Sequence, residues 1–222
     1  MIRILIATAL IVVAPELRAG CDDAPGPGVD WSGCNKERIV LTRASLQKGK
    51  FDRAVLAGMN FASADLAAAS FLSAEFNRTS FRGANLEAAR FDKAMAVRSN
   101  FSGARMNGAS LEKAELVRSN LSGAQLRGAR LSKGDFGRSV FDKADLSDAD
   151  LRFSNLARAR LTEAKLAGAD LSNAFTLNTR FDGSDLSAVK GLTQAQLDIA
   201  CGDAKTRLPA RLKKPGSWPC AE

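Results

Sequence analysis

The stretch that decides the fold is LEKAELVRSNLSGAQLRGARL, which runs from Leu111 to Leu131. Every fifth residue in it is Leu, and the residue two positions before each Leu is small. The same spacing holds from Leu46 to Leu186 without an insertion or a deletion. Of the 29 positions in this register, 16 are Leu and 10 are Phe, and the position two before is Ala in 19 of the 29. A repeat this regular predicts one architecture for about two thirds of the chain.

A spacing of five fits neither a long helix nor a flat strand. In an α-helix, five residues turn the chain by about 500°, or about 140° net, so the large side chains would scatter around the axis. In a strand, side chains alternate between the two faces, so an odd spacing would place successive Leu residues on opposite faces. The pattern closes only if the chain is extended for about three residues and then turns a corner. Four corners make a coil of 20 residues, which predicts an all-β solenoid.

Stacked coils place each residue over the residue 20 positions later, and like side chains then lie over like. One inner column begins with three phenylalanines, and so does a second. The members are Phe51, Phe71 and Phe91 in the first and Phe61, Phe81 and Phe101 in the second. We expect these rings to stack at about the 4.7–4.9 Å spacing of neighbouring strands.

Two segments carry a resemblance to a known family. ADLSDADLRFSNL (Ala144 to Leu156) and AKLAGADLSNA (Ala164 to Ala174) resemble the A(D/N)LXX pattern of the pentapeptide-repeat family. The resemblance implies a right-handed quadrilateral β-helix of about seven coils, with the Leu, Phe and Ala positions inside. At about 4.8 Å per coil, such a rod would be on the order of 34 Å long.

The N-terminus has the features of a secretory signal peptide. Within residues 1–20, Arg3 precedes the apolar run Ile4 to Ala14, and small residues follow at Ala19 and Gly20. An uncleaved anchor is the alternative, although 11 apolar residues are short for a membrane span. We therefore expect an exported protein, periplasmic or secreted, with no transmembrane span after cleavage.

The four cysteines lie outside the repeats, with Cys21 and Cys34 before them and Cys201 and Cys220 after them. Three pairings are arithmetically open. Because bridged Cα atoms lie within about 7 Å and the rod holds its ends apart, we expect disulfides Cys21–Cys34 and Cys201–Cys220, each closing one end. A lipid anchor at Cys21 is an alternative, against which Arg18 departs from the lipobox pattern. A zinc site is disfavoured, because the spacings are wrong and the chain has no His.

The composition divides the chain into residues 1–20, an irregular N-terminal cap (21–43), the β-helix (44–190) and a C-terminal helix and tail (191–222). Thr193 and Gln196 form a capping-box pattern for a short helix that would run to about Cys201, where Gly202 would end it. Three apolar side chains are expected to bury against the last coil: Leu192, Leu197 and Ile199. Dimerisation through the C-terminal region is a further hypothesis, but capping of a single rod explains Leu192 and Trp218 equally well.

Arginine recurs at the second residue after one inner column. The five positions, 20 residues apart, are Arg78, Arg98, Arg118, Arg138 and Arg158. In stacked coils, such arginines would form one edge of the rod, suited to bidentate capture of phosphate or carboxylate. The alternative is that they bond to carbonyls and pair with acids such as Glu75, Glu115 and Asp135. A neighbouring edge repeats the pattern with Arg53, Lys93, Lys113 and Lys133.

Charge and composition exclude several functions. The chain carries a net charge of +8, and residues 44–190 hold 22 basic and 16 acidic residues. Some cytoplasmic members of the family that the chain resembles mimic DNA and protect DNA gyrase. Such a mimic would have to be acidic, whereas this chain is basic. Nucleic-acid binding is not expected either, since only Phe153 and Phe175 would put aromatic rings outside the rod. With no His, no Tyr and a filled core, we expect no enzyme, no cofactor and no metal.

The leading hypothesis from the sequence is a non-enzymatic envelope scaffold or spacer. Its partner would be a protein or an anionic envelope component, bound through the basic edge. The alternative is an inhibitor or immunity-type protein that acts by surface mimicry on another protein.

Overall fold

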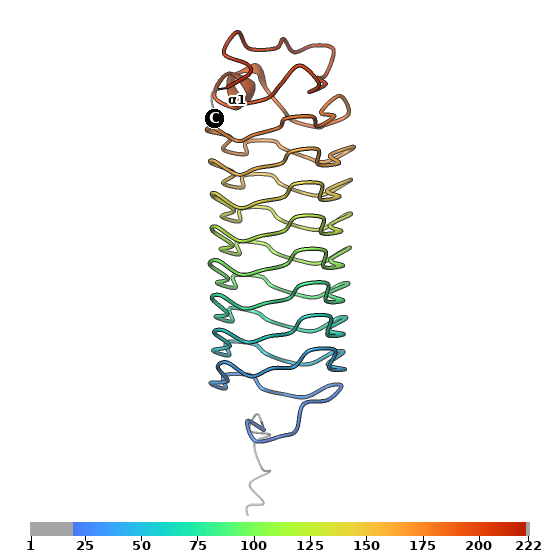
Figure 1. Ribbon diagram of the computed structural model, residues 1–222, viewed down its shortest axis with the longest axis vertical. Coiled ribbons are helices and arrows are strands. Elements are labelled where there is room, and N and C mark those ends of the chain that lie inside the picture. The colour runs from blue at the N-terminus through green and yellow to red at the C-terminus, as the bar shows by residue number, and fades with distance from the viewer. Residues whose placement is uncertain (1–19, 221–222) are drawn as a thin grey trace, which may run out of the picture.

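The computed structural model describes residues 20–220, which form a straight rod of stacked coils with its two ends at opposite poles (Figure 1). Parallel β-bridges join residues 20 apart, from Asp30 with Lys50 to Asp170 with Lys190. This ladder spans eight coils, on the order of 38 Å at about 4.8 Å per coil. The predicted all-β quadrilateral solenoid is confirmed. The signal peptide predicted for residues 1–20 lies, apart from Gly20, outside the described residues.

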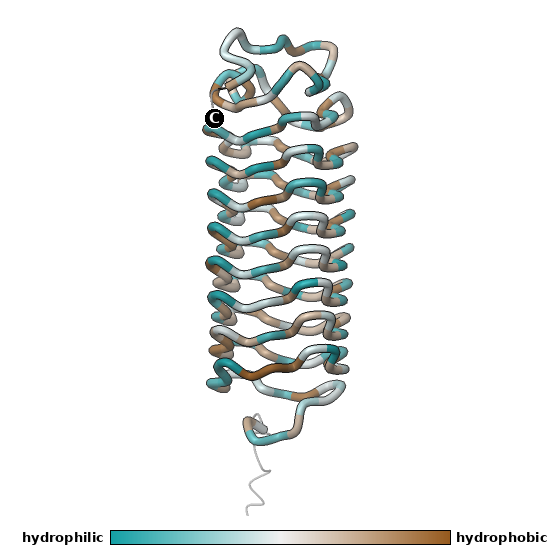
Figure 2. The backbone as a smooth tube through the Cα atoms, in the orientation of Figure 1, coloured by the Kyte–Doolittle hydropathy of each residue, from teal (hydrophilic) through white to brown (hydrophobic). Residues whose placement is uncertain are grey.

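Each side of a coil is short because a tight turn follows every inner residue. At the corner after Phe51, the Ala54 N–H donates to the Phe51 carbonyl at 3.1 Å, and Arg53 has a φ of 56°. A positive φ at this position is typical of a type II turn. The Arg53 N–H then donates to Leu72 of the next coil at 2.8 Å, so the turns themselves tie the coils together. Polar and apolar residues accordingly alternate along each coil (Figure 2).

The interior is filled by the Leu, Phe and Ala positions, as the repeat predicts. The two phenylalanine columns stack as expected. Ring centroids of Phe51 and Phe71 are 4.8 Å apart at an interplanar angle of 13°, and those of Phe81 and Phe101 are 4.9 Å apart at 9°. Rings of different columns meet edge to face, for example Phe71 and Phe81 at 5.7 Å. Burial of each such side chain contributes roughly 1.5–3 kcal/mol.

A buried line of hydroxyl groups, which the sequence analysis did not predict, runs along one inner column. Ser119 Oγ donates to the Ala96 carbonyl at 2.6 Å and accepts from the Ser99 N–H at 3.0 Å. Equivalent bonds to a carbonyl of the previous coil recur at four further positions. They are Thr79, Ser99, Ser139 and Thr179. These hydroxyls satisfy main-chain carbonyls inside the rod. Each belongs to the residue that directly follows the positive-φ residue of the same corner, as Ser119 follows Arg118.

The first coil begins at Asp30, earlier than the boundary predicted at residue 44. Trp31 and Cys34 occupy inner positions of this coil and are only 2% exposed. The Trp31 ring meets Phe51 edge to face at 5.8 Å, so it closes the aromatic column. A search for Leu and Phe missed this coil because Trp and Cys fill its interior. Cys21 and Cys34 form the expected disulfide, with Cα atoms 5.6 Å apart.

The C-terminal cap contains the single helix of the described residues, α1 (Gln194–Asp198). The predicted capping box between Thr193 and Gln196 is present. The helix ends earlier than Cys201, because the Ile199 carbonyl accepts from Asn178 of the last coil at 2.7 Å and pulls the chain back onto the ladder. Gly202 therefore does not end it.

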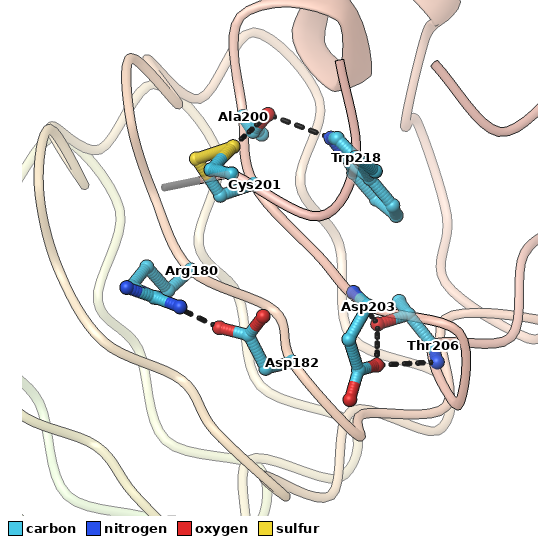
Figure 3. Close-up of a disulfide and its surroundings, with 8 residues drawn as sticks. Arg180, Asp182, Ala200, Cys201, Asp203, Thr206 and Trp218 are labelled. Carbon is cyan, nitrogen blue, oxygen red and sulfur yellow. Dashed lines mark hydrogen bonds and ion pairs between the residues drawn. A yellow bond between two sulfur atoms is a disulfide. The ribbon is translucent and has the colours of Figure 1, made fainter. Parts of the chain in front are cut away.

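Leu192 and Leu197 are buried against the last coil, as predicted, but Ile199 is 40% exposed and that prediction was wrong. The expected Cys201–Cys220 disulfide is present, with a Cα separation of 5.5 Å (Figure 3). Beside it, the Trp218 indole N–H donates to the Ala200 carbonyl at 2.7 Å. No helix within residues 20–220 is long and apolar enough to cross a membrane.

Candidate anion-binding face

The structure brings the five predicted arginines to one corner of the rod, in five successive coils. Arg78, Arg98, Arg118, Arg138 and Arg158, here called the arginine edge, are all exposed and all have φ between 57° and 59°. Their side chains therefore start from the same turn geometry, one coil apart.

None of the ion pairs among residues 20–220 includes a residue of the arginine edge. The acids considered as partners make no salt bridge with it. Asp135 instead accepts hydrogen bonds from the Gly137 N–H at 2.9 Å and from Asn155 Nδ2 at 3.0 Å. The alternative in which Glu75, Glu115 and Asp135 neutralise the arginines is therefore not the arrangement in this structure.

The second basic edge borders the same side of the rod. Its members, called the lysine edge, are Arg53, Lys93, Lys113 and Lys133. Their neighbouring acids turn to the adjacent side, where Asp92 Oδ2 lies 3.7 Å from Arg90 and Glu112 accepts from Ser132 Oγ at 3.1 Å. The lysine edge is thus also without an ion pair in the described chain.

The side between the two edges is called the basic-rimmed face. Its outward residues, one per coil, are Val55, Glu75, Met95, Glu115, Asp135, Asn155 and Phe175. No ion pair of residues 20–220 includes an outward residue of this face. At the lysine corner, Asp92 and Arg152 pair with Arg90, Asp150 and Asp170 of the adjacent side. Sequence analysis found both edges but missed that they frame one face. The sequence contains this information, because members of the two edges, such as Lys93 and Arg98, are five residues apart. They therefore lie on consecutive corners of one coil.

A groove of about 960 Å³ runs along the arginine edge. Its floor includes Val97, Val117 and Ala157, and it reaches Leu177 at its C-terminal end. Gly137 and Asp135 line its middle. An elongated anion could lie in this groove against a partly apolar floor with guanidinium groups along one wall, an arrangement suited to bidentate hydrogen bonds.

Two carboxylates of the rod, Asp145 and Asp150, are suited to structure rather than to proton transfer. The hydrogen bond from the Arg152 side chain lowers the pKa of Asp150, and the hydrogen bonds of Ser147 lower the pKa of Asp145 in spite of its partial burial. A general acid or base at neutral pH instead needs a raised carboxyl pKa. Residues 20–220 contain no cluster of three Cys, Asp or Glu side chains placed to hold a metal ion.

The stacked square coils define a β-helical repeat protein, and comparison with known proteins gives its family. The description "Pentapeptide repeat region" matches residues 44–121, and "Pentapeptide repeats (8 copies)" matches residues 119–156 and 144–187. These matches cover more than half of the chain, which therefore belongs to the pentapeptide-repeat family.

Several solved structures are similar. HetL of the cyanobacterium Nostoc sp. strain PCC 7120, a pentapeptide repeat protein involved in heterocyst differentiation regulation, is 24% identical over 76% of this chain and 89% of its own, with a TM-score of 0.44. A trypsin-treated form of QnrB1, a plasmid-mediated fluoroquinolone resistance protein, is 16% identical over 80% and 92%, also at 0.44. Rfr23 of Cyanothece 51142 is 26% identical over 53% and 65%, at 0.32. The search of curated proteins gave no match.

Proposed function

We propose that this protein is a non-enzymatic, exported interaction scaffold, periplasmic or secreted, that binds an elongated anionic partner along the arginine edge. The observation that carries the proposal is the distribution of charge. Five arginines line up at one corner on consecutive coils without one ion pair, and the ion pairs of residues 20–220 all lie elsewhere on the rod.

Repulsion within the edge supports the proposal. Like charges at the height of one coil, about 5 Å, repel by about 1 kcal/mol even in bulk water. A bound polyanion relieves this repulsion at several coils at once. Arginine is the suitable residue because its planar guanidinium binds carboxylate, phosphate or sulfate through two parallel hydrogen bonds.

The test is capture of the full chain on a sulfated-polysaccharide resin as a function of salt. The variant carries Arg98→Glu, Arg118→Glu and Arg138→Glu. The matched control carries Lys48→Glu, Arg82→Glu and Arg127→Glu, three exposed cations at other corners that also make no ion pair. Both variants lose the same net charge, and circular dichroism checks that both fold.

We expect the arginine-edge variant to elute at far lower salt than the control, which should stay close to the wild type. Binding of the wild type should weaken with salt, because exposed charges are screened beyond about 8–10 Å at physiological ionic strength. Equal losses in the two variants would mean that net charge alone drives binding, and the proposed function would be wrong.

A further inference from the structure

The exposed large apolar side chains of the rod gather on the basic-rimmed face. Six such residues are exposed within residues 20–220, and five of them lie on this face or at its arginine and lysine corners. They are Met95, Phe153, Phe175, Leu177 and Ile199. The exception is Val40, which pairs with Asn60 on the adjacent side.

Four of the five lie together at the C-terminal end of the face. Phe153 is 56% exposed, and Phe175, in the next coil, is 50% exposed. Leu177 follows two residues after Phe175, on the outside of the same coil and 38% exposed. Above them, the Ile199 main chain accepts a hydrogen bond from Asn178, at the end of the arginine edge. Large apolar side chains gathered on one surface are typical of an interaction site.

Packing within the rod does not explain Phe153. It has a φ of 58°, a conformation that bulky side chains rarely adopt, and its ring faces solvent rather than the core. The same turn position in the next coil is Asn173, a residue type that adopts this conformation readily. The rod therefore holds an exposed aromatic ring at a strained position where a polar residue would fit the turn better.

Charge identifies the partner that suits this group. Lys133, Arg138 and Arg158 flank the apolar group on the two corners, and none of them makes an ion pair. The outward residues of the face at this end, Asn155 and Phe175, are uncharged. The nearest acid of the face, Asp135, lies one coil below Asn155 and accepts a hydrogen bond from Asn155 Nδ2 at 3.0 Å. Aromatic side chains surrounded by unpaired cations are the combination by which proteins bind anionic bilayers peripherally.

We propose that the C-terminal end of the basic-rimmed face docks on an anionic phospholipid bilayer. Phe153, Phe175 and Leu177 enter the headgroup boundary, and Lys133, Arg138 and Arg158 contact the lipid phosphates. The inference rests on the proposed anion-binding function and names the bilayer surface as its partner. Two weak signals, apolar insertion and electrostatic attraction, act together, as reversible membrane attachment requires.

The test measures co-sedimentation of the full chain with vesicles of phosphatidylglycerol and phosphatidylethanolamine in equal parts, and with vesicles of phosphatidylcholine alone. The test variant carries Phe153→Asn and Phe175→Asn, which copy Asn173 and Asn155 from the neighbouring coils. The control is Val40→Asn, which copies its bridge partner Asn60. Each substitution thus introduces a residue type that already occupies the equivalent position in a neighbouring coil.

We expect the wild type to bind the anionic vesicles and not the phosphatidylcholine vesicles. The double variant should lose binding by roughly 10-fold or more, since two rings no longer leave water, while Val40→Asn should change binding by less than about 2-fold. The sulfated resin should still retain the double variant, because its arginine edge is intact.

Retention on the resin without any binding to anionic vesicles would overturn the bilayer proposal and leave the anion-binding function standing, with a soluble polyanion as the partner. Equal vesicle binding by the wild type and the double variant would also overturn it. If binding to the resin did not depend on the arginine edge, the proposed function itself would be wrong.

Discussion

Arg118 lies one coil above Arg98 at the same corner, and the two share the same turn conformation, with φ values of 59° and 58°. Neither guanidinium has an ion-pair partner in the described chain. The Arg98 main chain donates instead to Val117 of the coil above, so the backbone fixes the vertical alignment of the two side chains. Nothing in the rod depends on their charge, which makes this edge separable from folding.

Replacing Arg118 by Gly should weaken polyanion binding without destabilising the rod. Glycine adopts positive φ without strain, which offsets its larger entropy loss on folding, and repulsion along the edge decreases. We expect the free energy of unfolding to stay the same or rise by up to about 1 kcal/mol. Chemical denaturation and resin capture measure the two effects. A loss of more than about 1 kcal/mol would show that the side chain has a structural role.

Gly58 occupies the coil below Arg78, the first member of the arginine edge, and separates it from Arg38 at the same corner. Extending the edge into this coil should strengthen binding. Gly58 has a φ of 69°, and a Cβ there would lie 3.5 Å from Arg38 Cγ, an ordinary contact. Gly58→Arg should elute from the sulfated resin at higher salt than the wild type, with a loss of stability of about 1–2 kcal/mol from the turn. Gly103→Arg, at another corner with a φ of 64°, is the control. The same gain in both variants would mean that position on the edge does not matter.

The repeat made the coil, its core and the aromatic stacks predictable from sequence, because Leu and Phe recur every five residues from Leu46 to Leu186. The unbroken register also made the arginine edge predictable, because it places residues 20 positions apart at the same corner of successive coils. The first coil was missed because Trp31 replaces the usual Leu or Phe. The helix end was predicted wrongly because a hydrogen bond between the Asn178 N–H and the Ile199 carbonyl determines it. The local capping pattern of the helix does not contain this contact with the last coil. The absence of ion pairs on the basic-rimmed face was not predictable, since side-chain direction determines it.

The hydroxyl line should contribute to stability and not to binding. Ser119→Ala removes the bond to the Ala96 carbonyl and the acceptor for the Ser99 N–H. We expect a loss of about 1–2 kcal/mol in unfolding free energy. Because Ala159 occupies the same position two coils later, the substitution is sterically acceptable. Resin capture of the folded variant should match that of the wild type. Reduced capture would place the hydroxyl line in the binding machinery.

Asp203 should make the C-terminal cap sensitive to acid. A hydrogen bond from the Gly183 N–H lowers its pKa below the ordinary 3.8. Hydrogen bonds from Thr206 lower it further (Figure 3). A lowered carboxyl pKa gives stability that is complete above pH 3.8 and is lost as the pH falls toward the lowered value. Asp203→Ala should therefore lower the melting temperature at neutral pH, and the two melting temperatures should converge below pH 3.8. A difference independent of pH would contradict this account.

The most direct test of the basic-rimmed face is lysine footprinting by acetylation and mass spectrometry, with and without a sulfated polysaccharide. Lys93, Lys113 and Lys133 lie on the lysine edge, while Lys48 and Lys165 are exposed elsewhere on the rod. We predict strong protection of the three lysines at the edge of the face and little change at the other two. Uniform protection of all five lysines, or protection of Lys48 and Lys165 alone, would contradict the assignment of this face as the anion-binding surface.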